Sequence, residues 1–127
     1  MSDFSSALDL STSGLRAQAA RLRHLSENIA NADTPGYRRK TVPFHPDASG
    51  SGKVETGPVN LAQTPLKKVF DPTHPLADET GHFSGSNVNL LVEITDAREA
   101  QRSYEANLKI FDQTRQMSSA LKELLRK

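Results

Sequence analysis

SENIANADTPGY, residues 26–37, marks the point where a long helical pattern gives way to turns. Pro35-Gly36 suits the two central positions of a type II turn, because glycine readily takes the positive φ that the second position needs. Asn28 and Asn31 lie three residues apart and therefore share one face near the helix end. We expect their amides to bond backbone groups of a neighbouring helix and to hold this end, although an ordinary helix-to-turn junction has the same composition. The predicted turn comprises Asp33, Pro35, Gly36 and Tyr37.

The prolines and glycines divide the chain into three parts. All seven prolines lie between Pro35 and Pro75, and six of the seven glycines lie between Gly36 and Gly85. Since proline inside a helix costs about 3 kcal/mol, long helices are expected only where proline is absent. We predict a mainly α fold, in which long N- and C-terminal helices pair as a coiled coil around a small irregular or β-rich middle excursion. The predicted divisions are an N-terminal helical assembly arm (1–33), a middle segment (34–86) and a C-terminal helical assembly arm (87–127).

Both arms carry large apolar residues every seven positions, which is the spacing of a coiled-coil seam. A stripe of helical period most often forms a core within one chain. Here polar residues such as Ser11, Gln18, Gln101 and Arg115 interrupt the rows. Such a seam is weak between two helices but acceptable among many, so we predict that the arms pack with other chains. The expected assembly interface consists of Leu8, Leu15, Leu22, Leu25, Asn28, Ile29, Asn31, Leu90, Ile94, Tyr104, Asn107, Leu108 and Phe111.

The middle segment reads as short strands separated by turns. Strands are predicted at Tyr37–Phe44, with Pro43 marking an edge, and over 53–59 and 66–70. A Ser/Gly-rich loop is expected over 47–52 and a turn over 71–75. A small β-rich excursion and a mobile loop both fit this pattern.

The composition excludes several classes of function. The 127 residues contain 16 Lys+Arg and 15 Asp+Glu, whereas a nucleic-acid binder normally has a strong basic excess. The absence of cysteine excludes disulfides and thiolate zinc sites. The N-terminus lacks the basic and apolar regions of a cleaved secretory signal, and no run approaches 18 apolar residues, so membrane insertion is not expected. No nucleophile-base or phosphate-loop motif appears, and we expect no catalytic residue and no cofactor.

Two polar clusters have alternative readings. His74, Asp78 and His82 are spaced for a zinc site on one helical face, and hence for a zinc-dependent enzyme, but Pro75 and Gly81 make a continuous helix improbable. A solvated loop is favoured, and no metal is expected. Arg38-Arg39-Lys40 could bind nucleic acid or another anionic surface, but a strand would divide the three side chains between two faces. We expect these residues to form ion pairs between subunits.

The quoted stretch resembles the signature of the flagellar axial proteins, the family of rod, hook and hook-associated subunits. In that pattern a helix ends in Asn-Ile-Ala-Asn and a short Asp-Thr-Pro-Gly-Tyr turn follows. Asn87-Val88-Asn89, Glu93 and the run from Gln101 to Asn107 resemble the matching C-terminal helix. The middle stretch over 69–83 is similar to that of the proximal-rod members. The likeness covers nearly the whole chain apart from the loop over 47–52.

This resemblance implies a structural, non-enzymatic subunit of the periplasmic rod of the flagellar basal body, which transmits motor torque for motility. The implied partners are other rod subunits, copies of the chain itself and the flagellar type III export apparatus, through which subunits pass unfolded. The terminal helices are implied to form on assembly. Two alternatives stay open. The chain over 33–39 is compact, as in a sister rod protein, which allows a different axial position; and a small helical hairpin could present the middle segment as a binding module.

Overall fold

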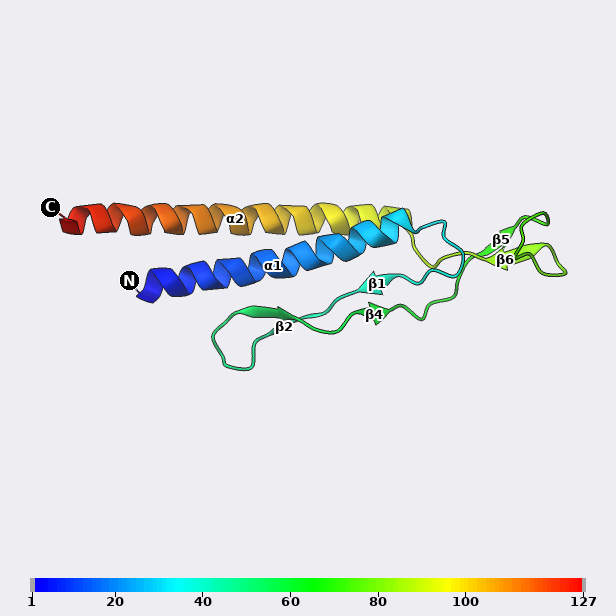
Figure 1. Ribbon diagram of the computed structural model, residues 1–127, viewed down its shortest axis with the longest axis horizontal. Helices are drawn as coiled ribbons and strands as arrows, with labels where there is room; N and C mark the ends of the chain where they lie inside the picture. Colours follow the sequence, from blue (N-terminus) through cyan, green and yellow to red (C-terminus); the bar gives the residue numbers. More distant parts are fainter. Residues whose placement is uncertain (1, 127) are drawn as a thin grey trace.

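Two long antiparallel helices dominate the computed structural model, which describes residues 2–126 (Figure 1). Helix α1 spans Ser2–Ala30 and α2 spans Leu90–Arg126, and the two pack against each other. Neither contains proline, in keeping with the cost of proline inside a helix. The predicted mainly α fold with two terminal helices in contact is therefore confirmed. Within the described residues, neither helix is long and apolar enough to cross a membrane.

Local hydrogen bonds define the inner ends of both helices. After α1, the Asn31 amide donates to the Glu27 carbonyl at 2.8 Å and accepts from the Thr34 hydroxyl at 3.1 Å. Gly36 has a φ of 75° and the Tyr37 N–H donates to the Thr34 carbonyl, as a type II turn requires. At the start of α2, the Asn89 side chain accepts from the first backbone N–H groups and caps the helix.

Most of the middle segment forms a long hairpin that runs back beside α1 (Figure 1). Strand β1 (Lys40–Thr41) pairs antiparallel with β4 (Asn60–Leu61), and β2 (Phe44–Pro46) pairs with β3 (Val54–Thr56). The register shifts by one residue between the two ladders, so that the second strand is bulged near Pro58. We call the paired residues 39–62 the ribbon.

A second hairpin projects beyond the helices, away from both chain ends (Figure 1). It pairs β5 (Lys68–Phe70) with β6 (His82–Ser84), and a loop over 71–81 closes it. The strand predicted over 66–70 is present as β5 but is shorter than expected. The strand predicted over 37–44 was wrong in extent, because the ladder is interrupted around Pro43, which has no N–H to donate. Strands β4 and β6 were not predicted.

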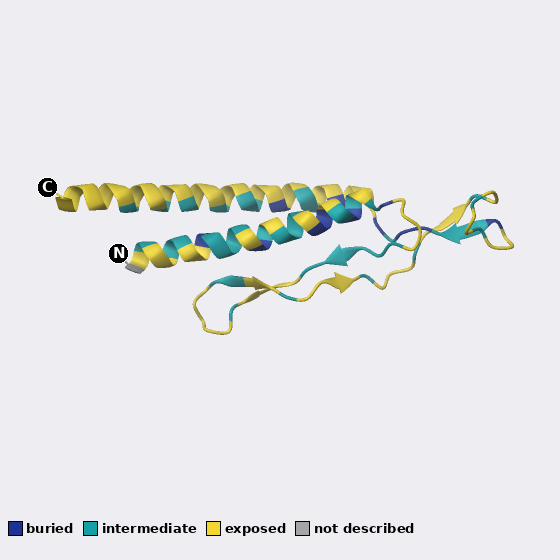
Figure 2. Ribbon diagram, viewed as in Figure 1, coloured by how far each residue is buried: buried dark blue, intermediate teal, exposed yellow. Residues whose placement is uncertain are grey.

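Burial is concentrated where the helices meet the middle segment (Figure 2). Among the described residues, Val88, Ala100, Asn28 and Glu93 are completely buried, and only two of these four are apolar. Farther along the helix pair, Gly14 lies against Asn107, so closely that an added Cβ would come within 3.0 Å of the Asn107 side chain. Small and polar residues thus allow the helices to approach each other.

Candidate functional site: a polar junction and an open helix groove

Asn28 uses the full hydrogen-bonding capacity of its buried amide. Its Nδ2 donates to the Lys40 carbonyl at 2.9 Å and to Glu93 Oε2 at 3.2 Å. Its Oδ1 accepts from the Lys40 N–H and from the Tyr37 hydroxyl, each at 2.8 Å. By pairing with both backbone groups of Lys40, the side chain replaces a neighbouring strand. We had expected Asn28 to bond backbone groups of a neighbouring helix. In the structure the bonded backbone belongs to β1 of the same chain.

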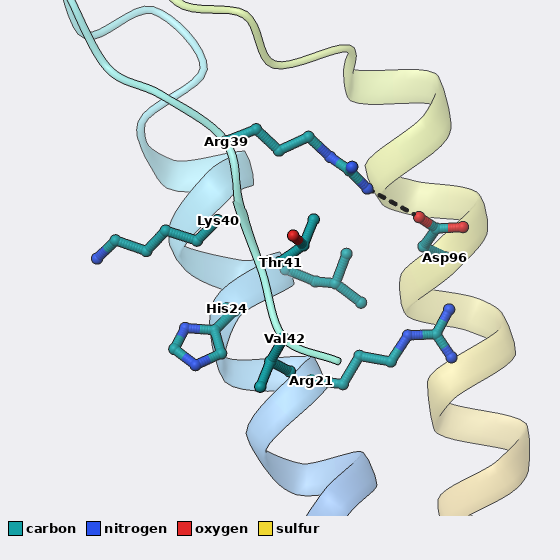
Figure 3. Close-up of a pocket in the computed structure, with 8 residues that line it drawn as sticks. Arg21, His24, Arg39, Lys40, Thr41, Val42 and Asp96 are labelled. Carbon is teal, nitrogen blue, oxygen red and sulfur yellow. Dashed lines mark hydrogen bonds and ion pairs between the residues drawn. The ribbon is translucent and has the colours of Figure 1, made fainter. Parts of the chain in front are cut away.

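Glu93 is a fully buried carboxylate in the first turn of α2. Arg39 Nε pairs with its Oε1, and the same guanidinium donates to Asp96 Oδ2 at 3.1 Å (Figure 3). A buried charge is tolerated only when it is paired and hydrogen-bonded. Arg39 and Asn28 together supply those partners, so the ribbon, α1 and α2 meet at one carboxylate.

The other basic residues of the cluster also bond within the chain. Lys40 Nζ lies 2.9 Å from Glu27 Oε2, and the Arg38 guanidinium donates to the carbonyls of Ala62 and Thr64. The hydrogen bond from Lys40 lowers the pKa of Glu27, and the same bond raises the pKa of Lys40. This cluster was expected to form ion pairs between subunits. In the described chain Arg39 and Lys40 instead form ion pairs with α2 and α1, and Arg38 bonds to carbonyls of the middle segment.

Tyr37 and Asn87 complete this arrangement, which we call the junction (Asn28, Tyr37, Arg39, Asn87 and Glu93). Burial raises the pKa of the Tyr37 phenol, whose hydroxyl donates to Asn28. Asn87 accepts from the Arg39 N–H at 2.6 Å and donates to the Ala62 carbonyl at 2.9 Å, and so binds both strands of the ribbon.

Sequence reasoning missed the role of Glu93 and assigned Arg39 elsewhere. The signal was present, since Glu93 shares a seven-residue row with Ala100 and Asn107. A carboxylate in a buried row requires a basic partner. The partner could not be chosen from the sequence, because three consecutive basic residues were equally available.

The structure places the predicted assembly residues in three classes of burial. Leu25 and Asn28 are buried. Leu90, Ile94 and Leu108 are exposed. The others are partly buried: Leu8, Leu15, Leu22, Ile29, Asn31, Tyr104, Asn107 and Phe111.

Among the described residues of the two helices, Leu25 is the only large apolar side chain that is buried. The other buried residues include Ser11, Ala17 and Ala100, and the Gln18 Oε1 is buried without a hydrogen-bond partner in the described part of the chain. On the outside of α2, by contrast, Leu91 is 74% exposed, and Val92 and Ile110 are also exposed. The helix pair thus presents bulky apolar groups outward, the arrangement of a surface that meets other proteins.

The ribbon covers only one side of the helix pair. On α1 it contacts Ser13, whose hydroxyl accepts from the Val54 N–H at 3.2 Å, and on α2 it reaches Asp96 through Arg39. Helical spacing places a row of aliphatic side chains from both helices on the opposite side. We call this row the open groove; it consists of Leu8, Leu15, Leu22, Ile29, Ile94 and Leu108.

A small cavity of about 160 Å³ lies under the ribbon, between α1, β1 and α2 (Figure 3). Its lining includes Arg21, His24, Leu25, Arg39 and Asp96. Arg39 and Asp96 are paired with each other across its rim. The Arg39–Asp96 pair thus joins the ribbon to α2 beside the cavity.

His74, Asp78 and His82, the residues of the zinc hypothesis, make separate contacts within the projecting hairpin. His74 stacks on Phe83 with ring centroids 3.9 Å apart, and Asp78 accepts from Thr80 and from the His82 backbone. Across residues 2–126, no group of three potential metal-ligating side chains is found. In the described hairpin these residues shape the loop over 71–81.

Two family models match the two helical ends of the chain. The model described as flagella basal body rod protein matches residues 8–38, and the model for the C-terminal part of the flagellar basal body rod FlgEFG proteins matches residues 79–124. These matches include Asn28, Tyr37, Asn87 and Glu93, and hence four residues of the junction.

Individual relatives match over nearly the full length. The flagellar basal-body rod protein FlgC of Agrobacterium fabrum is 42% identical, over 99% of this chain and 98% of its own length. FlgC of Salmonella typhimurium is 36% identical over 86% of this chain and 88% of its own, and FlgC of Aquifex aeolicus is 32% identical over 92% and 93%. The chain therefore belongs to the flagellar basal-body rod protein family, whose members are structural and not enzymatic.

Proposed function

We propose that this chain builds the proximal part of the rod by packing its open groove against helices of neighbouring subunits, copies of itself included. The observation that carries this proposal is the incomplete burial of the six aliphatic residues, which helical spacing places on the side away from the ribbon. Burying one such side chain stabilises an assembly by about 1.5–3 kcal/mol. The near-full-length match to proteins named FlgC supports the proximal position over another axial position.

The weak contact within the chain supports the further proposal that subunits pass unfolded through the flagellar type III export apparatus. A seam of small and polar residues contributes little to holding the two helices together in isolation. Neighbouring helices in the rod would supply the missing apolar contacts. The folded subunit would then become stable only after it has packed into the rod.

Charge placed in the open groove tests the assembly surface. Leu22→Asp and Leu108→Asp, each expressed as the only copy in flagellated cells, are expected to abolish swimming while leaving the exported amount unchanged. The physical reason is that a carboxylate in a buried apolar contact is unpaired and costs several kcal/mol. Swimming is measured in soft agar. Export is measured by immunoblot of the chain outside the cytoplasm, in cells that export the chain but do not assemble the rod.

Gln116→Asp is the matched control, since it adds the same charge to an exposed position of α2. It is expected to swim normally. Mass spectrometry of purified basal bodies should find the native chain in the rod and neither groove variant. If both groove variants swim and are incorporated, the open groove is not the assembly surface.

A helical-hairpin binding module is the competing function, for which the long projecting hairpin would be the recognition element. Such a module requires no basal body. Recovery of basal bodies that lack this chain would favour it.

A further inference from the structure

The two ends of the elongated molecule both expose large apolar side chains. At one end, α2 continues beyond the start of α1 (Figure 1). The pairing of Asn28 with Glu93 and of Arg21 with Glu99 sets the antiparallel register, in which the first residues of α1 lie near residue 118. The last turns of α2 therefore have no partner in the described chain. We call residues 119–126 the overhang.

The overhang continues the contact between the helices. Leu121 follows the row of Ala100, Asn107 and Thr114, and Leu125 follows the row of Tyr104, Phe111 and Ser118, each at seven-residue spacing. Leu125 is 74% and Leu124 is 70% exposed. The overhang is thus a stretch of the same seam with larger apolar residues and without α1 to cover them.

The opposite end is the tip of the projecting hairpin, residues 69–83. Phe70 is 64% and Leu76 is 62% exposed. Phe70 is held by an edge contact with His82, at 5.0 Å between ring centroids, and by the close approach of Gly81. The tip therefore presents its apolar groups on an ordered turn.

The charges of the two ends are complementary. The tip carries Asp71, Asp78 and Glu79, and the chain has no Lys or Arg between Lys68 and Arg98. The overhang carries Lys122 and Arg126 against one acid, Glu123. Such opposite patches favour docking and steer its orientation.

We propose that the hairpin tip of one copy docks on the overhang of a second copy, with Phe70 and Leu76 covering Leu121, Leu124 and Leu125. This contact rests on the proposed rod function, because an open rod needs head-to-tail contacts between different surfaces. A contact between two overhangs would close a dimer and end growth. The tip-to-overhang contact uses the tip of one copy and the overhang of the other. The overhang of the first copy and the tip of the second stay free for further contacts.

The cysteine-free sequence allows a direct test. Cells are given the chain with Leu76→Cys and Leu124→Cys together, and basal bodies are oxidised and analysed by immunoblot without reductant. The pair is expected to give disulfide-linked multimers, while each single variant stays monomeric. Lys122→Glu added to the pair should reduce the linked fraction several-fold, and Glu79→Lys should restore it, because the charges are then exchanged.

The matched control combines Leu76→Cys with Gln116→Cys, which is exposed on α2 outside the overhang. Equal cross-linking of the control pair would overturn the proposal, as would dimers of the Leu124→Cys variant alone. Swimming cells whose basal bodies contain the double variant without any cross-link would also overturn it. That last outcome leaves the rod function intact, whereas absence of the native chain from basal bodies would reject the rod function itself.

Discussion

At the scale of single residues, Asn28 and Glu93 show how few groups hold the elements together. The Asn28 amide bonds the backbone of β1 as a neighbouring strand would. The Glu93 carboxylate accepts hydrogen bonds from Asn28 of α1 and from Arg39 of the ribbon. Polar groups of this kind are costly when one partner is removed and nearly neutral when all are satisfied. The identity of each junction residue is therefore constrained by its partners.

Asn28→Ala tests this constraint. The change removes the donor to Glu93 Oε2 and both bonds to the backbone of Lys40, while the pairing of Glu93 Oε1 with Arg39 remains. Each buried group left unbonded costs about 1–3 kcal/mol. We expect basal bodies with this variant to release the chain at a lower urea concentration, measured by mass spectrometry of the pelleted rods. Ser26→Ala, an exposed change on the same helix, serves as the control and should behave as the native chain. Equal urea resistance of all three would show that the junction does not stabilise the rod.

The Glu27–Lys40 pair gives an acid dependence with a definite sign. Since Lys40 lowers the pKa of Glu27 below its ordinary value of 4.5, the pair stabilises the chain above that pH and loses this contribution as pH falls through the lowered pKa. Glu27→Gln should weaken basal bodies at neutral pH, and the difference from the native chain should vanish in acid. Release of the chain between about pH 7 and 3 is the measurement. Glu55→Gln is the control, and a difference that persists in acid would assign the effect to packing.

At the scale of elements, the contact between α1 and α2 depends on small residues. Gly14 costs helix propensity of about 1 kcal/mol relative to alanine, yet its missing Cβ leaves room for the Asn107 side chain. The close approach of the two helices is the gain that offsets this loss. Elsewhere in the seam, Ala17 and Ala100 have the same effect.

Gly14→Ala and Asn107→Ala are expected to be coupled. The alanine at position 14 meets the Asn107 amide at 3.0 Å and separates the helices, so the single change should weaken swimming. Asn107→Ala in the same chain removes the obstacle and should restore it, with a coupling of about 0.5–3 kcal/mol in the urea resistance of the rods. Additive effects of the two changes would mean that this contact is absent from the assembled subunit.

At the scale of the whole molecule, the subunit exposes more surface than a compact monomer. Its accessible surface is 8681 Å², whereas a folded monomer of 13.9 kDa exposes about 6,700 Å². The excess of roughly 2,000 Å² is larger than the roughly 800 Å² that one partner buries in a standard protein–protein interface. The elongated shape in Figure 1 thus leaves more surface accessible than a compact fold of this mass would.

The isolated chain should accordingly contain little stable helix. Circular dichroism of the purified chain in dilute solution is expected to show much less helix than the two helices of the structure contain, and assembled rods should show the full amount. Long helices without a sufficient apolar contact are marginal in water. A monomer that is fully helical and melts cooperatively would contradict this prediction and favour the binding-module alternative.

The sequence by itself determined where the two helices lie, because proline and glycine, which disfavour helix through local effects, are confined almost entirely to the middle. It also placed the turn at Pro35-Gly36, since few residues other than glycine take a positive φ without strain. Only the tertiary structure decided which basic residue pairs with Glu93, which side of the helices the ribbon covers, and where β4 and β6 lie. These depend on contacts between residues distant in the chain, whose energies are set by proximity and burial and leave no periodic signal in the sequence.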